Sequence, residues 1–99
     1  MTIDFHAEVD KRKEALMEDL FGLLRINSER DDSKADEKHP FGPGPVKALE
    51  HFLALAERDG YKTRNIDNYA GDFEFGQGDE VLGIFAHLDV VPAGSGWDT

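Results

Sequence analysis

A chain of 99 residues is long enough for one small domain, and its 39% share of hydrophobic residues is too high for a wholly disordered protein. Its 11 basic and 21 acidic side chains give a net charge of -10, which argues against nucleic acid as a partner because phosphates would be repelled. Cysteine is absent, so disulfides are excluded and a transition metal would have to be held by His, Asp or Glu.

The N-terminal segment 1–10 lacks the basic start and apolar core of a signal peptide. No stretch of the sequence approaches the length of apolar residues that a membrane span requires. We therefore expect a cytoplasmic protein without membrane contacts, whose negative charge serves solubility.

Apolar residues recur at helical spacing from Asp4 to about Arg25, with charged residues largely on the other side of the turn. Asp4 is suited to the N-cap, because its carboxylate can accept hydrogen bonds from free backbone N–H groups of the first turn. The pattern predicts an amphipathic helix whose apolar side packs against other parts of the protein.

The next segment, 29–38, is almost entirely polar and is expected to be a solvated loop. A second helix is predicted to begin with Gly44 as N-cap and Pro45 in the first helical position, where no N–H is needed. Gly60 can adopt the left-handed conformation that ends it. The predicted buried stripe of this helix consists of Leu49, Phe52, Leu53 and Ala56.

Two short strands are expected at 61–66 and 70–75, separated by a turn at Asp67-Asn68. The strongest predicted strand is 81–86, which is nearly continuous in apolar residues and is therefore expected to be covered on both faces. The order helix, helix, strands predicts part of an α/β layer.

His87 follows the apolar segment 81–86 directly, and Asp89 lies two residues further on. If the strand continues, both side chains project to the same face. A metal-binding imidazole commonly donates its second ring N–H to a carboxylate, so Asp89 is placed to orient His87. The pair by itself has a simpler explanation, a hydrogen-bonded structural histidine.

The stretch His87-Leu88-Asp89-Val90-Val91-Pro92, followed by Trp97, is more specific than the pair. It resembles the signature of the metallopeptidase family that includes aminoacylase, carboxypeptidase G and the PepV-type dipeptidases. The resemblance implies that His87 binds one of two zinc ions and that Asp89 belongs to the catalytic site as the residue that holds His87 in place. Three upstream segments are similar in order and spacing to the start of PepV-type dipeptidases: 19–26, 40–42 and 68–71.

The resemblance also implies a fold and a reaction. The fold would be α/β, the N-terminal part of a zinc-peptidase catalytic domain with two helices packed on a mixed sheet, and residues 1–99 would be one incomplete segment of that domain. The full-length parent enzyme would hydrolyse dipeptides with two zinc ions. The general base and the remaining ligands would lie beyond Trp97, so these 99 residues would need the rest of the parent chain to be active.

Two other functions fit the same residues. The parent could be an N-acyl amino acid deacylase or desuccinylase of the same family, since the bond-breaking chemistry is shared. The chain could instead be a non-enzymatic acidic interaction module. The other histidines, His6, His39 and His51, are expected at the surface, and Trp97 could either line a substrate cleft or anchor the packing of its loop.

Overall fold

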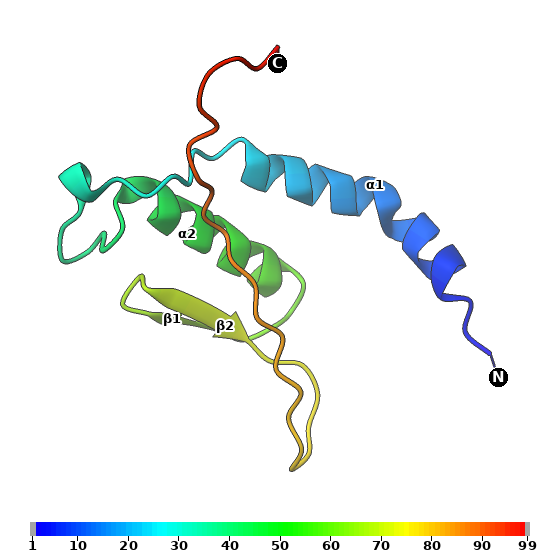
Figure 1. The fold of residues 1–99 in the computed structure, drawn as a ribbon. Coiled ribbons are helices and arrows are strands. Elements are labelled where there is room, and N and C mark those ends of the chain that lie inside the picture. Colours follow the sequence, from blue (N-terminus) through cyan, green and yellow to red (C-terminus); the bar gives the residue numbers. More distant parts are fainter. Residues whose placement is uncertain (1, 99) are drawn as a thin grey trace.

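The computed structural model describes residues 2–98 and contains two long helices beside a small hairpin. In chain order the elements are α1 (Phe5–Leu24), the short 3-10 helix η1 (Asp32–Lys34), α2 (Pro43–Arg58), β1 (Thr63–Ile66) and β2 (Ala70–Phe73). Helix α2 lies along the hairpin, while α1 extends away from both, as Figure 1 shows. None of the helices among residues 2–98 has the length and apolarity that crossing a membrane requires.

Helix α1 begins where the sequence predicts. Asp4 is its N-cap, and the Asp4 carboxylate accepts a hydrogen bond from the Ala7 N–H at 3.1 Å. This bond satisfies one of the backbone donors that have no partner inside the first helical turn. The helix ends at Leu24, one residue before the predicted end.

The expected packing of α1 was wrong for this part of the protein, because the described residues bury none of its side chains. Its apolar stripe is exposed by 42–71% at Phe5, Val9, Leu16, Leu20 and Leu24. The reason is geometric: α1 meets α2 only near its C-terminal half, where a Cβ on Gly22 would lie 2.9 Å from the His51 ring. Residues 2–98 therefore cover the stripe only in part, near its C-terminal end, where Leu23 is half-buried.

Helix α2 begins two residues earlier than predicted. Gly42 is the N-cap with φ of 99°, and Pro43 occupies the first turn. Gly42 is required for two reasons, because that φ disfavours other residues and a Cβ there would lie 2.9 Å from the Asp31 carbonyl oxygen. Gly44 and Pro45 are consequently inside the helix. The predicted end is confirmed, with Asp59 as C-cap and Gly60 at φ of 92°.

The core lies between α2 and the hairpin. Among residues 2–98 the buried hydrophobic side chains are Val46, Ala48, Leu49, Leu53 and Ala56, all on α2. Gly71 allows β2 to lie close to α2, since a Cβ there would lie 2.9 Å from Leu49 Cδ1 and 3.1 Å from Leu53 Cδ1. Phe52, which was predicted to be buried, is only half-buried and packs against Phe73 with ring centroids 5.9 Å apart.

Strands β1 and β2 pair in antiparallel fashion, with Thr63 opposite Phe73 and Ile66 opposite Ala70. The predicted turn is confirmed: Asp67 and Asn68 have φ of 52° and 64°, and the Tyr69 N–H donates to the Ile66 carbonyl at 2.9 Å. Two successive positive φ values give the twist that a tight hairpin needs. The mixed sheet expected from the sequence is absent from residues 2–98, where the sheet has these two antiparallel strands.

The predicted strand at 81–86 does not form. This segment forms no β-ladder, and the exposed fractions of Val81, Leu82, Ile84 and Phe85 are 87–98%. A strand is held by backbone hydrogen bonds to its neighbours, and no other part of residues 2–98 pairs with this segment. The segment instead belongs to a loop that projects beyond the hairpin (Figure 1).

The exposed apolar segments make the molecule less compact than a closed domain. Its radius of gyration is 16.5 Å, compared with about 13 Å for a compact domain of about 100 residues. The observed fold is thus a small α/β unit, α2 on a hairpin, with α1 and the segment 76–98 attached to it.

An ion pair between the two long helices gives a testable pH dependence. Arg58 donates two hydrogen bonds of 2.9 Å to the Asp19 carboxylate, which holds the pKa of Asp19 below its ordinary value of 3.8. Because the folded-state pKa is lowered, the pair stabilises the packing of α1 on α2 above pH 3.8, and this contribution is lost as the pH falls through the lowered pKa.

Asp19→Asn is therefore expected to reduce the protection of α1 amides from hydrogen exchange at pH 7, and to have no effect once the pH is below the lowered pKa. Asp10→Asn is the matched control, because Asp10 is exposed on the same helix and makes no ion pair within residues 2–98. Equal loss of protection in both variants, or a loss that persists in acid, would show that the Arg58 pair does not hold α1.

Candidate metal-binding site

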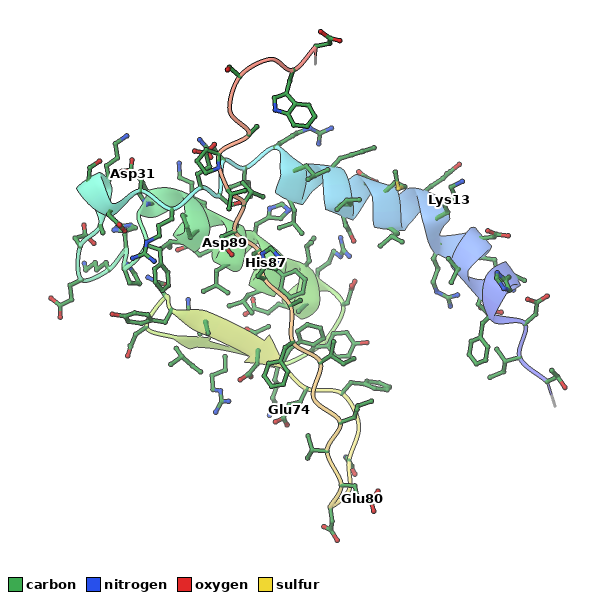
Figure 2. All side chains as sticks on the ribbon, viewed as in Figure 1. Lys13, Asp31, Glu74, Glu80, His87 and Asp89 are labelled. Carbon is green, nitrogen blue, oxygen red and sulfur yellow. The ribbon has the colours of Figure 1, made fainter. Side chains whose placement is uncertain are left out.

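His87 and Asp89 lie next to each other in the C-terminal segment, and both are labelled in Figure 2. His87 Nδ1 is 3.0 Å from the Asp89 backbone carbonyl oxygen and 3.3 Å from Asp89 Oδ1. The two-residue spacing predicts that these two residues lie close together, although the segment that carries them is not a strand in the structure. The shorter contact is to the backbone carbonyl, which sequence reasoning missed.

This geometry favours one form of the His87 ring. A carbonyl oxygen only accepts hydrogen bonds, so Nδ1 must be the nitrogen that carries a proton. In the neutral ring the second nitrogen, Nε2, then presents its lone pair. The hydrogen bond of the ring within residues 2–98 is made by Nδ1 and not by Nε2. The His87 side chain is 84% exposed, so Nε2 is open to solvent.

The His87 ring has the donor chemistry of a zinc ligand. Neutral imidazole is a common zinc ligand, and its other ring N–H is usually held by a carbonyl or a carboxylate. Asp89 supplies both kinds of acceptor to the same nitrogen. Residues 2–98 hold no cluster of three or more His, Asp or Glu side chains that could bind a metal, so they do not form a complete metal site by themselves.

The residue that follows the pair contacts a distant part of the chain. The Val90 N–H donates to the Ser28 carbonyl with an N to O distance of 3.4 Å, and Val90 forms a parallel bridge with Glu29. Ser28 is 3% exposed and is the buried polar residue of the described chain. Nothing in the local sequence 27–30 indicates that Ser28 has a backbone partner 62 residues further along the chain.

The other histidines lie apart from this pair. His6 is exposed on α1, and His51 is half-buried on α2 beside Gly22. His39 Nδ1 is 2.8 Å from Asp36 Oδ1, and this contact is the main reason that the pKa of Asp36 is lowered. His39 and Asp36 thus partner each other in the loop before α2.

The loop carboxylates are likewise engaged locally. Asp31 caps η1 and accepts hydrogen bonds from the backbone and hydroxyl of Ser33, which hold the pKa of Asp31 below its usual value. Trp97 donates its ring N–H to the Ala93 carbonyl at 2.7 Å and is 71% exposed. This bond closes the loop 93–97 on itself, so both interpretations of Trp97 stay open.

Known proteins are similar to this chain over most of its length. The chain is 50% identical over 92 residues to a protein of Staphylococcus haemolyticus (strain JCSC1435) named as a putative dipeptidase. It is 51% identical over 92 residues to proteins with the same designation from Staphylococcus aureus strains USA300 and NCTC 8325. Each alignment covers 93% of this chain and 20% of the relative. The chain thus spans about one fifth of the length of these relatives, and no family model matches it.

Proposed function

We propose that this chain is the N-terminal segment of the catalytic domain of a zinc-dependent dipeptidase, and that residues 1–99 contribute one metal ligand to that enzyme. Relatives about 50% identical over 93% of the chain are named as putative dipeptidases. The observation that carries the metal role is the His87 ring, whose Nδ1 is held by Asp89 while Nε2 is open.

His87 binds the metal through Nε2 in this proposal. The Asp89 carbonyl oxygen positions the ring by accepting a hydrogen bond from the Nδ1–H, and the Asp89 carboxylate lies 3.3 Å from the same nitrogen. The negative charge of Asp89 also strengthens the imidazole as a ligand. When bound, zinc lowers the pKa of a water molecule and polarises the scissile carbonyl.

The proposal requires further residues from the parent protein. A catalytic zinc site has about three protein ligands, and two zinc ions and a general base are part of the proposed enzyme. The described residues supply one ligand, so the 99-residue chain alone is proposed to be inactive. The cytoplasmic location and the dipeptide substrates are parts of the same proposal.

Metal removal from the full-length protein tests the function. We expect dipeptide hydrolysis to be lost when a chelator removes the metal and to return when zinc is added. Hydrolysis by the metal-free protein at the rate of the zinc-loaded form would refute the proposal.

The same assay separates the proposed substrate from the related ones. Dipeptides, N-acyl amino acids and succinylated amino acids are compared at equal concentration, and the dipeptides are expected to give the highest kcat/KM. The non-enzymatic interaction module would instead require a natural protein of about 11.1 kDa, which intact mass of the protein from its source would reveal.

A further inference from the structure

The chain between α1 and η1 passes directly over the first turn of α2 at Gly44. A Cβ on Gly44 would lie 2.0 Å from the Asn27 carbonyl oxygen, 3.1 Å from the Asn27 carbonyl carbon and 3.3 Å from Ser28 Cα. All three atoms belong to backbone, which cannot rotate out of the way as a side chain can. Gly44 is therefore required by the close approach of two backbones, and no positive φ is involved.

Further backbone contacts connect this turn to the candidate metal-binding site. The Ser28 carbonyl accepts the Val90 N–H, and Glu29 bridges to Val90. The turn 27–29 is itself held by Asn27, whose side-chain oxygen accepts the Glu29 N–H at 3.2 Å. A continuous series of backbone contacts thus connects Gly44 to the residue that follows Asp89.

We propose that Gly44 is a positioning residue for the metal site: its missing side chain lets the turn 27–29 lie close to α2, and this turn places Val90, Asp89 and His87. The proposal rests on the function proposed above. A methyl group at Gly44 would overlap the Asn27 carbonyl. The turn 27–29 would have to move away from α2 to relieve this overlap. Val90 would move with the turn or lose its bond to Ser28, and the His87 ring would shift in either case.

The test uses the full-length protein with Gly44→Ala. We expect zinc affinity, measured by competition with a chromophoric chelator, to fall by about 10–100-fold, the range seen when a residue that orients a metal ligand is lost. In the cobalt-substituted protein, the visible absorption bands should shift in position or intensity, because they report ligand geometry.

Gly22→Ala is the matched control. It is also a glycine-to-alanine change inside a helix, and the new Cβ would meet the His51 ring at 2.9 Å. That ring can rotate away, and α1 at Gly22 does not belong to the contacts that lead to Val90. We expect Gly22→Ala to keep the zinc affinity and the cobalt spectrum of the unmodified protein.

Unchanged zinc affinity and cobalt spectrum in Gly44→Ala would overturn the positioning role. His87→Ala in the same titration separates this outcome from failure of the proposed function: if His87→Ala binds zinc normally, the metal site itself is misassigned. If Gly44→Ala does not fold, hydrogen exchange of the unmodified protein tests the positioning role instead. Zinc binding should then slow exchange at 27–30 together with 87–91, and slowing confined to 87–91 would overturn the proposal.

Discussion

If the proposed function holds, replacing His87 with alanine in the full-length parent protein is expected to lower kcat/KM for dipeptides by more than about a hundredfold. The loss of a residue that only orients a metal ligand costs about 10–100-fold in affinity or activity, and removal of the ligand itself should cost more. The bound zinc, measured by atomic emission, should fall in the same variant. The open Nε2 and the held Nδ1 of His87 are the reasons for this expectation.

Asp89→Ala should have a smaller effect than His87→Ala. The Asp89 carbonyl, which makes the shorter contact with Nδ1 at 3.0 Å, belongs to the backbone and is kept in the variant. Only the carboxylate at 3.3 Å is removed. We therefore expect a loss of about tenfold, at the lower end of the range for such partners.

His6→Ala is the matched control for these variants, because His6 is exposed on α1 and belongs to neither the His87 pair nor the turn 27–29. It should retain full activity and full zinc content. Activity of His87→Ala close to that of His6→Ala, with the fold intact by circular dichroism, would contradict the role of His87. A loss in Asp89→Ala as large as in His87→Ala would mean that the backbone carbonyl does not hold the ring.

The isolated 99-residue chain is expected to unfold gradually on heating rather than in a sharp transition. Four large apolar side chains at 81–85 are 87–98% exposed. Burying each such side chain contributes about 1.5–3 kcal/mol, so the four exposed side chains leave about 6–12 kcal/mol of hydrophobic stabilisation unused. The free energy of unfolding of a typical domain is of similar size, about 5–15 kcal/mol. Circular dichroism, dye binding to apolar surface and sedimentation would together show a loosely packed, self-associating chain.

Two substitutions test whether the segment 81–86 causes this behaviour. Leu82→Lys with Ile84→Lys should reduce self-association of the isolated chain, because charge replaces exposed apolar surface. The same pair should inactivate the full-length enzyme if the segment is a covered strand there, since an unpaired charge would be buried. A sharp, reversible melt of the unmodified 99-residue chain as a monomer would contradict the expectation.

Local features of the fold could be predicted from the sequence. Asp4 as N-cap, Gly60 at the end of α2 and the Asp67-Asn68 turn each depend on a few adjacent residues, and the structure has all three. The sequence predicted Gly44 as the N-cap of α2, whereas the structure has Gly42. The local sequence does not distinguish the two, because Gly42-Pro43 and Gly44-Pro45 offer the same cap twice. The contact of Gly42 with Asp31, distant along the chain, decides between them.

The sequence by itself determined the two long helices, the hairpin and the pairing of His87 with Asp89, since caps, turns and two-residue spacing act through neighbouring residues. Only the tertiary structure decided what lies beside each element: a largely uncovered apolar stripe on α1, an unpaired segment at 81–86, and a Val90 whose N–H is bonded to the Ser28 carbonyl. The physical reason is that hydrophobic cover and strand pairing require a partner distant in sequence. An apolar pattern states that a partner is needed, but it does not state which residues provide it.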